Sequence, residues 1–411
     1  MKYPHRPAVS KFSVLQQLCN HIPPHLVAKL ARETGVDKLC RTFSAWSHVV
    51  AMLYAQLTHA IGLNDVCDAL RLHSGPLSAL RGASAPSRNG LSHAGKQRDA
   101  LLAEKLFWAM VGHVQGLSAG FAKGRQGKGI CHRFRKTIHL VDSTTIELIA
   151  SCMDWAKHRR RKAAAKCHMR LDLQTFLPRA AIVDVAKEAD AKRARELCAG
   201  VRDGEILIFD RAYVDFLHLW ELTQRGVSWV TRTKENSRFR VVKKRPCNDA
   251  KILADEEVVL AVEATREKYP QRLRRVRALV EVDGQQKVLE LLTNNMEWSP
   301  RSVAELYRSR WSIEAFFKQI KQTLKLADFL GHSANAVRWQ IWSALLCYLL
   351  LRFQSYLANW TGSFTRLFTL IRAALWSRLD LPELLRCHCG TAGGSFRALA
   401  TPQQAYFLHL V

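Results

Sequence analysis

The middle of the chain alternates strand-like and helix-like segments, and their order restricts the fold more than any other feature. Three apolar runs, at 137–148, 166–175 and 179–190, lie close together, which predicts neighbouring antiparallel strands. A helical stretch, a fourth strand ending at Asp210, a second helix and a fifth strand follow up to residue 236. The order β-β-β-α-β-α-β predicts an α/β (α+β) domain in which helices flank one mixed sheet.

The N-terminal part of the chain has a different pattern. Residues 11 to about 120 have apolar positions at the helix period and few strand signals. A helix-turn-helix within residues 25–50 is one interpretation of this region, and a plain helical bundle is the other. Residues 330–411 are also predicted to be helical.

A strand-rich, basic segment follows the fifth strand. It covers about 238–298, and a long helix begins after it, with Ser299 as a plausible N-cap and Pro300 in the first turn. We interpret this segment as a β-rich insertion before the helix. The changes in pattern predict three domains, at 1–130, 131–329 and 330–411.

The charge of the chain indicates a polyanionic partner. Sixty-two Lys and Arg residues against 35 Asp and Glu residues give a net charge of +27 and a pI near 10.0. Nucleic acid is the leading candidate for a globular protein this basic. A membrane surface is the alternative, but the positive charge is spread along the chain instead of being gathered in one amphipathic helix.

Other sequence features favour a cytoplasmic location without a membrane span. The N-terminus lacks the apolar core of a signal peptide, and the longest apolar run, 341–351, is too short to cross a bilayer. None of the eleven cysteines is part of a CxxC pair, which favours free thiols. A zinc site at 387–389 has no second ligand pair to support it.

A predicted helix at 307–321 places four polar residues on one face. At about 100° per residue they fall within an arc of roughly 60°, and they are Tyr307, Arg310, Glu314 and Lys321. An apolar stripe lies beside them, so the helix is expected to pack on a core while the polar row lines a groove. A solvated face with Glu–Lys pairing is the alternative.

Three carboxylates are candidates for one site. Asp142 lies within the first strand, Asp210 closes the fourth, and Glu314 projects from the helix. If the first and fourth strands are neighbours, the three side chains converge. Carboxylates without softer ligands suit Mg²⁺ or Mn²⁺, and two such ions about 3.5–4 Å apart promote in-line displacement at phosphorus. Each aspartate alone is more often the cap of a turn.

These motifs resemble the IS-four family of insertion-sequence transposases, whose DDE catalytic core has an RNase H-like fold. The family signature Y-x2-R-x3-E-x6-K matches Y-RS-R-WSI-E-AFFKQI-K at all four positions. VDST around Asp142 and FDRAY around Asp210 resemble the two aspartate motifs of the family. The insertion also stands where family members have one. The resemblance covers residues 130–330.

The resemblance implies roles for individual residues. Asp142, Asp210 and Glu314 would be the catalytic metal ligands of a two-metal Mg²⁺ site, with Mn²⁺ possible. The remaining signature residues, Tyr307, Arg310 and Lys321, would contact DNA phosphates.

Three further residues are predicted to contact DNA from their chemistry alone. Trp311 and Trp298 are candidates for stacking on a base, with core packing as the alternative. Arg232 is a candidate for a phosphate contact, with a solvated strand end as the alternative.

The implied function is cut-and-paste DNA transposition. The partners would be double-stranded DNA, at the inverted repeats and at the target, and a second copy of the chain in a synaptic dimer. The N-terminal region would then bind DNA, the C-terminal region would serve dimerisation, and the protein would be associated with a bacterial nucleoid. A nuclease of the same fold without strand transfer, and a non-catalytic DNA-binding repressor, are the alternatives.

Overall fold

The computed structural model describes residues 7–124, 130–148, 157–159, 162–185, 190–282, 285–324 and 330–388. The chain divides into two compact units, which are described separately. The first, called the helical unit, consists of Met1–Ala122, Ile146–Ala164 and Phe317–Ala400. The second, called the sheet unit, consists of Lys123–Thr145, Ala165–Phe316 and Thr401–Val411.

The five predicted strands of the sheet unit form one mixed sheet, and their order is β4-β3-β1-β5-β6. Strand β1 is parallel to β5 and β5 is parallel to β6, whereas β3 and β4 are antiparallel. The predicted α/β order and the predicted neighbourhood of the first and fourth strands are confirmed. The strands are β1 (Ile138–Leu148), β3 (Lys162–Asp172), β4 (Pro178–Val185), β5 (Ile206–Phe209) and β6 (Ser228–Arg232).

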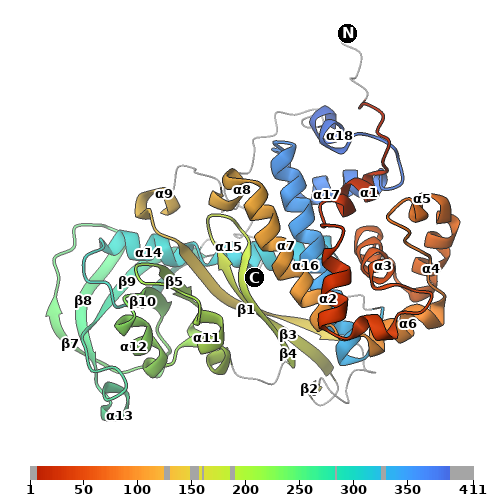
Figure 1. Ribbon diagram of the computed structural model, residues 1–411. Coiled ribbons are helices and arrows are strands. Elements are labelled where there is room, and N and C mark those ends of the chain that lie inside the picture. The colour runs from red at the N-terminus through yellow and green to blue at the C-terminus, as the bar shows by residue number, and fades with distance from the viewer. Residues whose placement is uncertain are drawn as a thin grey trace, which may run out of the picture. The chain divides into compact units, whose positions relative to one another are not determined.

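Strand β5 lies at the centre of the sheet because its sequence is apolar on both faces. All four of its residues are buried, as expected for a parallel strand that is covered on both faces. Helix α11 (Asp190–Cys198) precedes it and helix α12 (Phe216–Gln224) follows it (Figure 1). Leu197, Leu207 and Leu222 belong to the same buried core.

The segment interpreted as an insertion is strand-rich, as predicted, and it continues the same sheet. Strand β10 pairs antiparallel with β6, with Leu291 opposite Arg232, and the order then runs β10-β9-β8-β7. The elements are β7 (Phe239–Lys244), β8 (Ile252–Leu260), α13 (Glu263–Arg266), β9 (Leu273–Val282) and β10 (Gln285–Thr293). The insertion therefore extends the sheet and does not form a separate sheet of its own.

The predicted single helix at 307–321 is wrong in one respect, because the structure has two helices and a π-helical turn there. They are α14 (Pro300–Arg308), α15 (Trp311–Lys318) and η4 (Gln319–Thr323). Ser299 caps α14 as predicted. At the break, Ser309 donates its hydroxyl to the Leu306 carbonyl, and the Arg310 amide bonds to Tyr307, so the chain turns more tightly than an α-helix. The arc calculated for the four polar residues assumed a continuous α-helix. It therefore does not apply to this segment.

The helical unit contains both terminal helical regions, which the sequence assigned to separate domains. Helix α16 (Ala334–Leu357) is buried almost all round, so it needs partners on several sides, and it packs against α3 and α7 (Figure 1). Helix α3 (Ala45–Thr58) is also buried on nearly every face. A helix buried in this way cannot enter a DNA groove, which favours the bundle interpretation over a helix-turn-helix that would use α3.

The remaining described elements are helices and one short strand. They are α1 (Val14–Asn20), α2 (Leu26–Glu33), η1 (Val36–Leu39), α4 (Leu63–Leu72), α5 (Ser74–Ser78), α6 (Arg88–Gln97), α7 (Leu101–Leu117), α8 (Ala119–Lys123), α9 (Ile130–Phe134), β2 (Lys157–Arg159), η3 (Arg211–Tyr213), α17 (Phe364–Ala373) and α18 (Leu381–His388). Within the described ranges, no helix combines the length and the apolar character needed to span a membrane.

Candidate active site at one edge of the sheet

Strand register brings two of the predicted aspartates together. Val141 of β1 is paired with Phe209 of β5, and Phe209 is paired in turn with Thr231 of β6. The next residue on each of the three parallel strands is therefore Asp142, Asp210 or Arg232. Since residues at the same level of parallel strands lie side by side on the same face, these three side chains share one edge of the sheet.

Arg310 links the third carboxylate to the first. Its Nη1 donates to Oδ2 of Asp142 at 2.6 Å, and its Nη2 donates to Oε1 of Glu314 at 2.8 Å. Both distances are typical of charge-assisted hydrogen bonds. The Asp142 side chain is 15% exposed and that of Arg310 12%, whereas that of Glu314 is 41% exposed. Glu314 is therefore the more accessible of the two carboxylates that Arg310 bridges.

Backbone groups hold the two aspartates. Oδ1 of Asp142 accepts a hydrogen bond from the Ser143 amide at 2.8 Å. Asp210 caps the short helix η3 and accepts from the Ala212 amide at 3.3 Å. The FDRAY motif thus fixes Asp210 as a helix cap, which is the alternative role that the sequence offered for a single aspartate. The cap does not move Asp210 away from Asp142, because the register of β1 and β5 is kept.

The electrostatic environment reflects the gathering of charge. Burial raises the pKa of Asp142 to about 6, against the lowering effect of Arg310 and the Ser143 amide, while Asp210 and Glu314 raise it further. Burial alone lowers the pKa of Arg310, but the surrounding acidic groups outweigh it and the pKa lies above its usual range. These groups include Asp210 as well as Asp142 and Glu314. Arg310 therefore interacts electrostatically with all three carboxylates.

Tyr307 and Arg232 border this cluster. Tyr307 is buried, and its ring centroid lies 5.9 Å from the Arg310 guanidinium carbon. Burial raises the pKa of Tyr307, Arg310 and Arg232 lower it, and Asp210 raises it. The charges on Arg232 and Asp210 therefore both act on the Tyr307 hydroxyl, consistent with the position that the strand register gives them.

The predicted tryptophans are both half-buried. The Trp298 ring packs edge to face against Phe134, at 5.1 Å between ring centroids. Its carbonyl accepts a hydrogen bond from Arg274, and its amide donates to Asn295 Oδ1 at 2.9 Å. Trp311 is the first residue of α15, directly after Arg310.

Lys321 is placed differently from the other signature residues. It lies in the π-helical turn η4 and belongs to the helical unit. Its expected position beside Glu314 relied on a continuous α-helix, which the structure does not have. The lysine contact with DNA therefore stays a prediction.

Sequence reasoning missed a buried ion pair that supports Trp298. Nε and Nη2 of Arg274, on β9, each donate to an oxygen of Asp255, on β8, at 2.7 Å. Both side chains are almost fully buried. The alternation of buried residues in β9 places Arg274 on the same face as Val276, and this pattern could have indicated its burial. Its partner on β8 was not predictable from spacing.

The carboxylate oxygens of the site suit a hard divalent cation, although they are not grouped around a metal-binding position in this structure. Within the described ranges, no three His, Cys, Asp or Glu side chains are grouped closely enough to hold a metal ion. Arg310 instead takes up oxygens of Asp142 and Glu314. The nearby oxygen donors are carboxylates, which Mg²⁺ and Mn²⁺ prefer. The zinc motif at 387–389 extends outside the described residues.

A mixed sheet with carboxylates side by side on neighbouring strands is typical of the DDE transposases, and comparison with known proteins agrees. A family model described as the transposase DDE domain matches residues 133–350, and a domain of unknown function, DUF4372, matches residues 10–80. The chain belongs to the DDE transposase family, within the group of transposases of IS4-type elements. The predicted resemblance is therefore confirmed.

Three relatives illustrate the extent of the similarity. A putative transposase, y4zB, of Sinorhizobium fredii (strain NBRC 101917 / NGR234) is 31% identical over 65% of this chain and 74% of its own length. A probable transposase for insertion sequence element IS5377 of Geobacillus stearothermophilus is 26% identical over 54% and 57%. Transposase InsG for insertion sequence element IS4 of Escherichia coli (strain K12) is 26% identical over 45% and 42%.

Proposed function

We propose that this transposase cuts phosphodiester bonds at the ends of its element and joins the freed 3′-hydroxyls to target DNA. The observation that carries the proposal is the register of β1 and β5, which sets Asp142 beside Asp210. Arg310 ties Glu314 to the same edge. The chain's membership of the DDE transposase family makes this edge the natural place for the chemistry.

The three carboxylates would hold Mg²⁺ or Mn²⁺, and bound divalent cations activate the attacking oxygen and stabilise the leaving one. The protein's own residues would position the substrate. Arg232 and Arg310 carry guanidinium groups suited to phosphate, and both charges lower the pKa of the Tyr307 hydroxyl. A strand whose phosphate meets the carboxylate edge would pass these groups.

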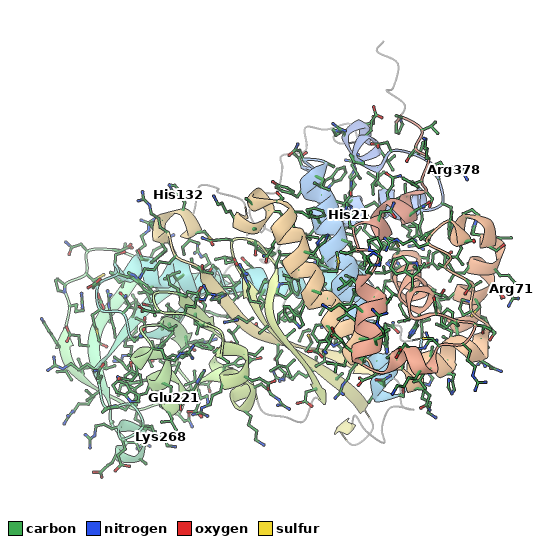
Figure 2. The ribbon with its side chains drawn as sticks, viewed as in Figure 1. His21, Arg71, His132, Glu221, Lys268 and Arg378 are labelled. Carbon is green, nitrogen blue, oxygen red and sulfur yellow. The ribbon has the colours of Figure 1, made fainter. Side chains whose placement is uncertain are left out.

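The substrate would be duplex DNA at the inverted repeats of the element, and afterwards target DNA. The net charge of +27 supports a polyanionic partner. Basic side chains such as Arg71 and Lys268 stand out from the surface of their respective units (Figure 2). Because two ends are joined in one event, we expect two copies of the chain to act together in a synaptic homodimer.

The test uses purified protein, Mg²⁺ and linear duplexes taken from the DNA that flanks the coding sequence. Asp142→Asn, Asp210→Asn and Glu314→Gln are each expected to slow cleavage by at least about a thousandfold, equivalent to about 4 kcal/mol in the barrier. Binding of the same duplex in a gel-shift assay should be nearly unchanged. The matched control is Asp68→Asn, which removes an exposed carboxylate from α4.

The outcomes separate the candidate functions. Cleavage followed by joining to a target plasmid supports transposition, whereas cleavage without joined products supports a nuclease. Sequence-specific binding with no cleavage by the wild-type protein supports a repressor. Wild-type cleavage by any of the three carboxylate variants removes that residue from the proposed site.

A further inference from the structure

Arg310 occupies oxygens that the proposed metal site needs. The oxygens it binds are Oδ2 of Asp142 and Oε1 of Glu314, at 2.6 and 2.8 Å. A divalent cation held by the same oxygens would lie close to the guanidinium. Two cations so close repel each other, most strongly where solvent access is limited. The guanidinium and a metal ion therefore compete for these carboxylates.

The local structure allows Arg310 to leave. The residue stands between α14 and α15, where tight three-residue hydrogen bonds replace the regular helix. Its Nε is buried and has no hydrogen-bond partner among the described residues. The bridge therefore leaves one polar atom of the side chain unsatisfied. A rotation of the side chain would break two bonds without breaking a regular helical turn.

We propose that Arg310 is the resident counter-ion of the carboxylate edge and that binding of a divalent cation displaces its guanidinium from Asp142 and Glu314. This inference rests on the proposed function, because it takes those carboxylates as metal ligands. Before metal binds, the guanidinium keeps two partly buried acidic groups paired. After displacement it is free to bind a DNA phosphate beside the metal. Metal binding and DNA binding then strengthen each other, as linkage requires.

The test measures Ca²⁺ binding by isothermal titration calorimetry on the full-length protein, without DNA and without a reading of activity. Arg310→Met should bind Ca²⁺ at least about tenfold more tightly than the wild type, because the competitor is gone. Arg310→Lys should lie between them, since lysine keeps the charge but cannot bridge both carboxylates. The matched control is Arg232→Met, which removes the same charge from the same strand edge but no bond to Asp142 or Glu314.

A second measurement follows the arginine itself. In protein labelled with ¹⁵N at arginine Nε, the Arg310 signal is identified by its absence from Arg310→Met, and Ca²⁺ should shift it. An unchanged Arg310 signal at saturating Ca²⁺ would overturn the inference. Equal gains in affinity for Arg310→Met and Arg232→Met would also overturn it, because they would reflect net charge alone. So would loss of Ca²⁺ binding in Arg310→Met, which would make Arg310 a support for the carboxylates.

Failure of the proposed function gives a different result. If Ca²⁺ binds the wild type and Asp142→Asn equally, the carboxylates are not the metal ligands and the proposed site itself is wrong. If Ca²⁺ binding depends on Asp142 but is the same with and without Arg310, only the counter-ion inference is wrong.

Discussion

Two buried sites, one in the helical unit and one in the sheet unit, treat titratable side chains in opposite ways. In the helical unit, His48 of α3 is fully buried against Trp339, and neither ring nitrogen has a hydrogen-bond partner among the described residues. Burial, together with the charge of Arg98, lowers the pKa of His48 to about 3, so the ring stays neutral. In the sheet unit, Arg274 and Arg310 are buried as charged groups, each bound to carboxylates.

This difference shows what each unit gains from burial. In the helical unit, apolar packing around α16 is extensive enough to accommodate one unpaired neutral ring. In the sheet unit, each of these buried charges has a role. Arg274 binds the Trp298 carbonyl, and Arg310 faces the candidate active site. Buried ion pairs rarely add much net stability compared with apolar side chains. Their retention in one unit therefore indicates position and function more than stability.

The largest stability effect is expected from the Arg274–Asp255 pair. Arg274→Met leaves Asp255 buried with Arg245, at 3.6 Å, as its only ion-pair partner among the described residues. We expect the free energy of unfolding to fall by about 3–5 kcal/mol, measured by urea denaturation followed by tryptophan fluorescence. The double variant Arg274→Met with Asp255→Leu should recover most of this loss. If the single variant were as stable as the wild type, the contrast between the units would have no energetic basis.

A smaller effect on stability is expected from His48, and it depends on pH because this buried ring is neutral. The pKa of His48 in the folded state is lower than the value near 6.5 in the unfolded state. Between these two values the unfolded state binds a proton and the folded state does not. Stability should therefore fall as the pH falls from 6.5 toward 3, by about 2 kcal/mol at pH 5. His48→Phe should remove this part of the acid dependence, whereas His93→Phe, at an exposed position of α6, should not. Parallel pH profiles for wild type and His48→Phe would contradict the assignment.

A third effect, on DNA affinity instead of stability, concerns the two half-buried tryptophans of the sheet unit. If Trp298 stacks on a DNA base, Trp298→Ala should weaken binding to the cut element end by about 1–3 kcal/mol, measured by fluorescence anisotropy. Trp311→Ala provides the comparison, because the sequence offered the same two interpretations, base stacking and core packing, for both tryptophans. A larger loss of affinity for Trp311→Ala, with stability unchanged, would assign the stacking role to Trp311.

Much of the sheet was predictable because strand signals are local. Apolar runs fixed β1, β3, β4, β5 and β6, and the positions of Asp142 and Asp210 after such runs made their convergence a reasonable expectation. The helix at 307–321 was mispredicted because periodicity assumes uniform geometry, and Ser309 diverts its hydroxyl to the backbone. Partners distant in sequence were not predictable. Nothing local links Arg310 to Asp142 or Arg274 to Asp255.

The pairing of β10 with β6 delays completion of the sheet unit during synthesis on the ribosome. Leu291 must be made before it can meet Arg232, and Arg310 and Glu314 emerge later still. Pairs so far apart in sequence form slowly, because the chain loses loop-closure entropy before the stabilising contacts form. Translation that stops between β6 and β10 would leave one side of β6 unpaired, a strand edge prone to aggregation. Such truncated chains would also lack Glu314, so incomplete synthesis would give insoluble products that cannot cut DNA.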